Sequence, residues 1–140
     1  MTSNTNAGRT IERELTVSAS LERAYWALSE PEGWRSWLIE DGEIESLPDG
    51  WLHLKWSMGA KVQVKILESR PNENVVMEWY APSEPGRTTV IFRVSRLDDG
   101  TLVRLTESGF GQGDDWDRCY EATNEVWDFG LGRLQEALKP

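Results

Sequence analysis

A chain of 140 residues is long enough for one domain with its own hydrophobic core and too short for two of ordinary size. Its 24 acidic and 15 basic residues give a net charge of −9, and no Lys/Arg cluster supplies the basic surface that nucleic-acid binding requires. The negative charge disfavours an anionic membrane surface, and no apolar stretch is long enough to span a bilayer. We therefore expect no nucleic-acid partner and no stable membrane association.

Two further features of the composition bear on location and organisation. The chain has a single cysteine, Cys119, which cannot form an internal disulfide and fits a reducing, cytoplasmic location. Residues 1–9 are polar and lack the apolar segment of a secretory signal, so we expect a flexible N-terminal tail. The remaining residues, 10–140, are expected to form a single domain.

The first third of the chain predicts one strand and two short helices. Alternating polar and apolar residues over 10–17 predict the strand. Apolar residues then recur at three and four positions, which predicts an amphipathic helix capped by Ser18 or Ser20. Pro31 ends this helix and suits the first turn of a second helix over residues 31–38.

The rest of the chain predicts six strands in hairpin succession and one long helix. Turn residues separate the predicted strands, which are 43–47, 51–57, 60–70, 75–81, 88–97 and 101–110. Residues 114–138 return to helical spacing with one apolar stripe, and Asp114 or Asp115 can cap the helix. Consecutive strands with short turns predict an antiparallel sheet, and the segregated helices predict an α+β fold.

This order of elements resembles the helix-grip (SRPBCC) superfamily of polyketide cyclases, START-type lipid carriers and the birch pollen allergen (Bet v-type). Within that superfamily, four segments resemble the family of the activator of heat-shock-protein-90 ATPase. They are residues 11–37, Arg70 to Trp79, residues 100–110, and the final helix around Trp127. The resemblance implies a curved antiparallel sheet of six to seven strands, two short helices after the first strand, and a long C-terminal helix packed across the sheet over a cavity.

The residues needed for most catalytic and metal sites are missing from the sequence. His53 is the single histidine; its strand pattern indicates a structural or solvent-facing role, with a general base as the alternative. One Cys and one His cannot supply the ligands of a zinc site. The glycines of residues 109–113 lack the lysine of a phosphate-binding loop and suit a turn instead. We expect no metal and no cofactor.

Glu107 is the most informative polar residue. The alternation through Val103 and Leu105 directs Glu107 toward the inner face of the sheet, where an isolated carboxylate is unfavourable. In a helix-grip fold that face lines the cavity, so Glu107 could anchor a ligand. The alternative is a position at the rim, solvated or paired with an arginine. If the protein is an enzyme, Glu107 and His53 are the first catalytic candidates.

The aromatic residues divide into a packing group and a cavity group. The helical residues Trp26, Trp37 and Trp127 are expected to pack in the core. Others at sheet ends or at the start of the last helix could line a cavity or could fill volume. The predicted ligand-binding residues are Trp51, Trp56, Trp79, Glu107, Phe110, Trp116 and Tyr120.

Three functions follow from this reading. The favoured one is a binding protein that holds a small hydrophobic or aromatic molecule between the sheet and the last helix. The second is a cyclase- or hydratase-like enzyme that uses the same cavity, where orientation supplies much of the rate. The third is a co-chaperone of heat shock protein 90, ranked last because the eukaryotic activators carry a further N-terminal domain for which this chain has no room. The sequence leaves open whether the protein is a homodimer.

Overall fold

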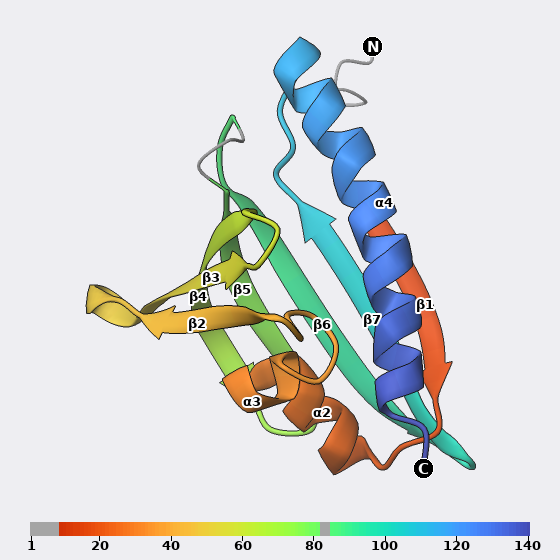
Figure 1. The fold of residues 1–140 in the computed structure, drawn as a ribbon. Coiled ribbons are helices and arrows are strands. Elements are labelled where there is room, and N and C mark those ends of the chain that lie inside the picture. Colours follow the sequence, from red (N-terminus) through yellow and green to blue (C-terminus); the bar gives the residue numbers. More distant parts are fainter. Residues whose placement is uncertain (1–8, 82–84) are drawn as a thin grey trace, which may run out of the picture.

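The computed structural model describes residues 9–81 and 85–140 (Figure 1). One antiparallel sheet of seven strands has the order β1-β7-β6-β5-β4-β3-β2. The strands are β1 (Ile11–Val17), β2 (Gly42–Ser46), β3 (Trp51–Trp56), β4 (Lys61–Arg70), β5 (Asn74–Tyr80), β6 (Thr88–Leu97) and β7 (Gly100–Ser108). Residues 1–8 of the predicted N-terminal tail and residues 82–84 of the predicted loop at 82–86 lie outside the described residues.

The helices occupy the predicted places, with one difference in length. They are α2 (Leu21–Ser29), α3 (Pro31–Trp34) and α4 (Asp114–Ala137), with a 3₁₀ turn η1 (Pro48–Gly50) between β2 and β3. Figure 1 shows α4 lying along β1 and β7, with α2 and α3 at the lower end of the sheet. This is the α+β helix-grip arrangement, so the predicted fold class is confirmed.

The second helix is shorter than the sequence predicts because side-chain contacts bend the chain after Trp34. The indoles of Trp34 and Trp37 donate to the backbone carbonyls of Leu28 and Ala27, at 2.8 and 2.7 Å. These bonds hold the segment after Trp34 against α2. At this contact Gly33 is required, since a Cβ there would lie 2.1 Å from the carbonyl oxygen of Trp26.

The structure shows which of the predicted helix-capping residues form cap hydrogen bonds. Ser20, and not Ser18, caps α2 by accepting a bond from the backbone N–H of Arg23 at 3.1 Å. Neither Asp114 nor Asp115 caps α4, because the residue before the helix is Gly113 and no side chain bonds there. Both aspartates lie in the first turn, where their negative charge interacts favourably with the positive end of the helix dipole.

The inner face of the sheet forms the core with the helices. The alternating residues Val90, Phe92 and Val94 of β6 are buried there, as are Val103 and Leu105 of β7. Other buried residues of the core include Leu54, Val64, Val75, Met77, Leu131 and Leu134. The outer face carries charged residues such as Arg93 and Arg104, both of which are exposed.

The two flanks of α4 contact different parts of the sheet layer. On one flank, Asn124 and Asp128 bind the guanidinium of Arg13 on β1. On the other, Arg133 donates to the carbonyl of Trp37 at 3.1 Å and pairs with Glu40, in the segment between α3 and β2. The helix is thereby fixed across the inner face, with one side toward β1 and the other toward β2 and β3.

Candidate ligand-binding site

Glu107 lies on the inner face of β7 and is almost completely buried, with 2 % of its surface exposed. In the sheet it is opposite Ile11 of β1 and Val90 of β6, both buried. The strand therefore places a carboxyl group in the apolar layer between sheet and helix. Of the alternatives that the sequence left open, the structure supports the inward position over the solvated rim.

Two neighbouring side chains of the described residues donate hydrogen bonds to the carboxylate of Glu107. The Thr88 hydroxyl donates to Oε2 and the Trp127 indole N–H donates to Oε1, both at 2.6 Å. Thr88 is 6 % and Trp127 1 % exposed. Hydrogen bonds to a charged acceptor are shorter and stronger than neutral ones, and buried ones are shielded from competing water. The three side chains fix one another, and they come from β6, β7 and α4.

Aromatic rings surround this polar group on the inner side. The Trp127 ring lies 5.7 Å from Phe92 in an edge-to-face arrangement and 5.8 Å from Trp79. Phe92 in turn contacts Trp37 edge-to-face at 6.2 Å. Such contacts add to the free energy of burying the rings. Trp127 is thus a core residue, as the sequence predicts, and also a hydrogen-bond donor to Glu107.

A second aromatic cluster lies at the start of α4. Phe110 is buried, 5.1 Å from the Tyr120 ring and 6.1 Å from Trp116. The Arg9 guanidinium lies 5.2 Å from the Tyr120 ring centre. Trp116 packs closely on Gly111, where a Cβ would come within 2.4 Å of its indole nitrogen. Three predicted ligand-binding residues, Phe110, Trp116 and Tyr120, therefore form one cluster, and their aromatic contacts are with one another.

Trp56 and Trp51 lie on opposite faces of the sheet. Trp56 is on the inner face, packs against the core, and donates its indole N–H to the carbonyl of Leu38 at 3.0 Å. Trp51 shares the outer face with His53, and the charged groups of Lys65 and Arg87 lie 5.9 and 5.2 Å from its ring. Trp51 is therefore separated from the other predicted ligand-binding residues.

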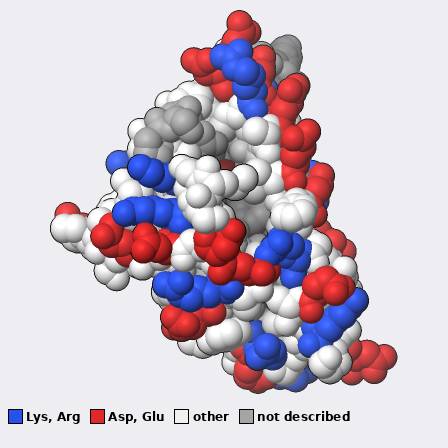
Figure 2. All heavy atoms as spheres, viewed as in Figure 1, with Lys and Arg blue, Asp and Glu red and all other residues white. Residues whose placement is uncertain are grey.

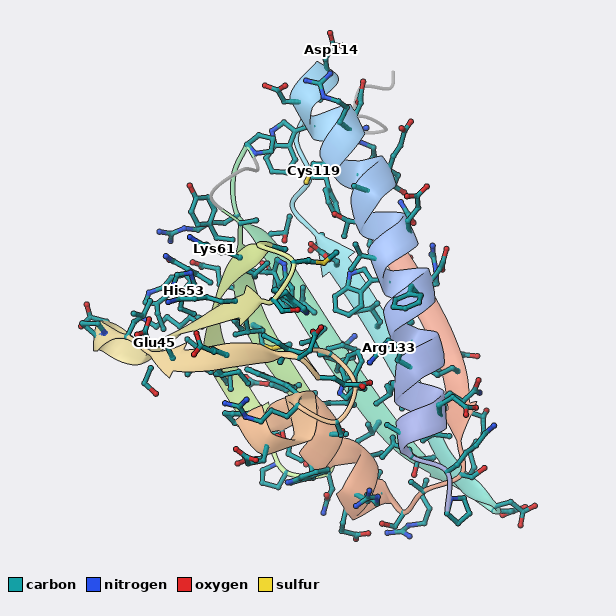
Figure 3. The ribbon with its side chains drawn as sticks, in the orientation of Figure 1. Glu45, His53, Lys61, Asp114, Cys119 and Arg133 are labelled. Atoms are coloured by element: carbon teal, nitrogen blue, oxygen red, sulfur yellow. The ribbon has the colours of Figure 1, made fainter. Side chains whose placement is uncertain are left out.

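His53 also lies on the outer face. Its Nδ1 is 3.9 Å from Glu45, and its buried Nε2 has no hydrogen-bond partner among the described residues. In Figure 3, His53, Glu45 and Lys61 lie on the side of the sheet remote from α4. Because Glu107 is on the inner face, the two catalytic candidates cannot act on one substrate.

The molecule is hollowed between α4 and the turn that joins β3 to β4. Figure 2 shows the hollow on the face that Figure 1 presents, over the end of β7, with red atoms of an acidic residue at its floor. β7 ends at this hollow, and it carries Glu107 near that end with the side chain on the inner face. Two other depressions, of about 280 and 270 Å³, are lined by residues 18–20 with 96–100 and by residues around Gln112, and neither includes Glu107.

Thr88 is the site residue that the sequence reasoning missed. It continues the inward alternation of Val90, Phe92 and Val94, which would have placed its hydroxyl beside Glu107. Within the described residues, no group of three His, Cys, Asp or Glu side chains is placed to hold a metal ion. What the arrangement provides is a fixed acceptor in an apolar, aromatic surround, which suits recognition of a polar group on an apolar molecule.

None of the described helices combines the length and hydrophobicity needed to span a membrane. No curated protein matches the chain. Among solved structures, the protein MLL2253 from Mesorhizobium loti is similar, with a TM-score of 0.76 and 23 % identity over 93 % of this chain and 96 % of that one. The Aha1 protein from Colwellia psychrerythraea, solved as a dimer in solution, has a TM-score of 0.74, 23 % identity and the same coverage.

DynU16, from the dynemicin biosynthetic locus, has a TM-score of 0.76 and 14 % identity over 92 % of this chain and 46 % of that one. At these identities the likeness shows a shared fold. The model of one family, described as "Activator of Hsp90 ATPase homolog 1-like protein", matches residues 18–139. That match covers nearly the whole chain and includes each segment of the site, so the protein belongs to the activator of Hsp90 ATPase homolog 1-like family.

Proposed function

We propose that this protein binds a small hydrophobic or aromatic molecule between the inner face of the sheet and α4, with Glu107 as the polar anchor. The observation that carries the proposal is the carboxyl group held in the apolar layer by Thr88 and Trp127. Taking a carboxylate out of water is costly, and replacing it by an apolar residue would be neutral or stabilising in many cores. A binding role explains why this position carries Glu. The cytoplasmic location expected from the sequence is part of the same proposal.

Access to the anchor is supported by the hollow over the end of β7 (Figure 2). Trp79 and Trp56 are half-buried on the inner face, so their rings contribute apolar area that a bound molecule could cover. Pockets for small molecules are mostly apolar and aromatic with a few well-placed polar groups. The aromatic residues around the carboxyl group of Glu107 have this composition.

Native mass spectrometry of the freshly purified protein tests the proposal. We expect an added mass that disappears on denaturation and that decreases in Glu107→Gln. Glu12→Gln, an exposed change of the same charge on β1, serves as the matched control and should retain the mass. If the wild-type protein carries no added mass and binds no apolar dye, the proposal is wrong.

A second candidate function comes from the family itself, whose description names an activator of the Hsp90 ATPase. An ATPase assay with purified chaperone tests it directly: a rise in turnover that survives Glu107→Gln would favour a surface role over the anchor.

The cyclase- or hydratase-like alternative would instead use the same anchor. It predicts that Glu107→Gln abolishes turnover while the mass of the bound molecule remains.

A further inference from the structure

Among the described residues, five large hydrophobic side chains are exposed, and three of them belong to the two elements that flank the hollow, α4 and the β3–β4 turn. Val126 and Phe129 of α4 are 57 % and 69 % exposed, and Met58 of the β3–β4 turn is 84 % exposed. We call these three residues the apolar collar. Clustered exposed apolar surface in a soluble fold marks a contact site, whereas single exposed residues do not.

The position of the collar on α4 follows from the helix contacts. Val126, Phe129 and Arg133 are spaced three and four residues apart, so they lie on one side of the helix. Arg133 binds Trp37 and Glu40, which directs this side toward the segment between α3 and β2, whereas Asn124 and Asp128 face Arg13 of β1. In Figure 3, Arg133 points from α4 toward that side.

The β3–β4 turn completes the collar from the opposite side of the hollow. Residues 57–60, Ser-Met-Gly-Ala, are exposed and carry no charge. Figure 1 shows this turn projecting toward α4, and Figure 2 shows uncharged surface on both sides of the hollow. A molecule that reaches Glu107 through the hollow therefore passes between apolar groups.

The floor of the hollow selects for a donor. The Trp127 indole can only donate, so Oε1 of Glu107 is an acceptor, and the Thr88 hydroxyl donates to Oε2. An anionic head group would meet a carboxylate at close range in a medium of low dielectric constant, where repulsion is strong. An ammonium group would instead form a charge-assisted hydrogen bond with the same oxygens.

The charge of the whole molecule acts in the same direction. The net charge is −9, and a protein field of this sign concentrates cations and repels anions. Figure 2 shows acidic side chains along the outer side of α4, beyond the uncharged border of the hollow. The exposed acidic residues of α4 are Asp114, Asp115, Asp117, Glu121, Glu125, Asp128 and Glu136. Arg133, a cation on the collar side of α4, is paired with Glu40.

We infer that the ligand is an amphipathic amine, which enters with its ammonium group toward Glu107 and leaves its apolar body in contact with Val126, Phe129 and Met58. This inference rests on the proposed function and adds the chemical class and the orientation of the ligand. The apolar collar then forms the entrance of the site, and the buried carboxylate of Glu107 discriminates between head groups.

Isothermal titration calorimetry with three matched probes tests the inference. Naphthylethylamine, naphthylethanol and naphthylacetate share the ring and differ in the head group. We expect the amine to bind about tenfold or more tightly than the alcohol, as for a hydrogen bond to a charged group, and the acid to bind weakest. Equal binding of amine and alcohol, or tighter binding of the acid, would overturn the amine assignment.

Variants at both ends of the site separate its two parts. Glu107→Gln keeps an acceptor of similar shape and should remove the preference for the amine, while Glu12→Gln should preserve it. Phe129→Ser at the exposed collar should weaken all three probes by a similar factor, roughly tenfold for about 50 Å² of lost apolar contact. Unchanged binding in Phe129→Ser would overturn the orientation.

The outcomes also separate this inference from the proposed function. If none of the three probes binds and no ligand co-purifies, the proposed function itself is wrong. If the probes bind at a site that Glu107→Gln does not affect, the ligand class is wrong while a binding role stands.

Discussion

The indole N–H of Trp127 on α4 donates to Oε1 of Glu107 on β7 at 2.6 Å, and both side chains are buried. This bond connects the last helix to the inner face of the sheet. Because each group is shielded from water, losing the bond leaves a buried polar atom without its partner, at a cost larger than the net contribution of an average hydrogen bond. The pair is therefore a structural contact as well as part of the proposed site.

Trp127→Phe should destabilise the protein by about 2–4 kcal/mol, since it removes the donor and leaves a small cavity beside Phe92. Urea unfolding followed by circular dichroism measures the change. Trp26→Phe is the matched control, because Trp26 is half-buried on α2 with the Arg23 guanidinium 5.4 Å from its ring. An equal loss in both variants would argue that ring volume matters and the bond to Glu107 does not.

Thr88→Val should cost about 1–3 kcal/mol, because the shape of the side chain is kept while Oε2 of Glu107 loses its donor. Thr88→Ser keeps the hydroxyl and loses one methyl group, so we expect a smaller loss, near 1 kcal/mol. The same urea titration ranks the two variants. Should Thr88→Val prove as stable as the wild-type protein, the bond does not stabilise the fold.

Gly33→Ala should be strongly destabilising, by several kcal/mol, because the new Cβ would lie 2.1 Å from the backbone oxygen of Trp26. Gly132→Ala in α4 meets nothing within 4 Å and should stabilise the helix by about 0.5–1 kcal/mol. In thermal unfolding, Gly33→Ala should lower the melting temperature and Gly132→Ala should raise it. A neutral Gly33→Ala would mean that α2 and α3 can separate without loss of stability.

Trp79→Leu should weaken binding of naphthylethylamine several-fold, because Trp79 lies on the inner face 5.8 Å from Trp127. Trp51→Phe and His53→Gln should leave the affinity unchanged, since both residues lie on the outer face of β3. Calorimetric titration of the three variants measures this difference. A loss of affinity in Trp51→Phe would place the ligand on the outer face and contradict the site described above.

The strands were predictable because each has a clear period of two and ends at turn residues. β6 and β7 begin and end within two residues of the predicted positions. The same alternation also determines which residues share a face of the sheet. Trp51 and Trp56 are five positions apart along one strand, and an odd offset places them on opposite faces. Thr88 has the same parity as Val90 and Phe92, which places it inward.

Other features depend on contacts between distant segments. The early end of α3 follows from bonds of Trp34 and Trp37 to carbonyls of α2, which no local pattern encodes. α4 begins at Asp114, directly after Gly113, so Asp114 and Asp115 lie in its first turn although both have good capping propensity. At α3, local preference is weaker than the packing of Trp34 and Trp37 against α2.

The acidic composition, the α+β order of elements and the inward direction of Glu107 were determined by the sequence, because charge and side-chain alternation are local properties. Whether Glu107 lay at a solvated rim or in the core was decided by the tertiary structure, through the position of α4. Trp127 of α4 and Thr88 of β6 are 20 and 19 residues from Glu107 along the chain, and they meet its carboxylate only when helix and sheet pack together.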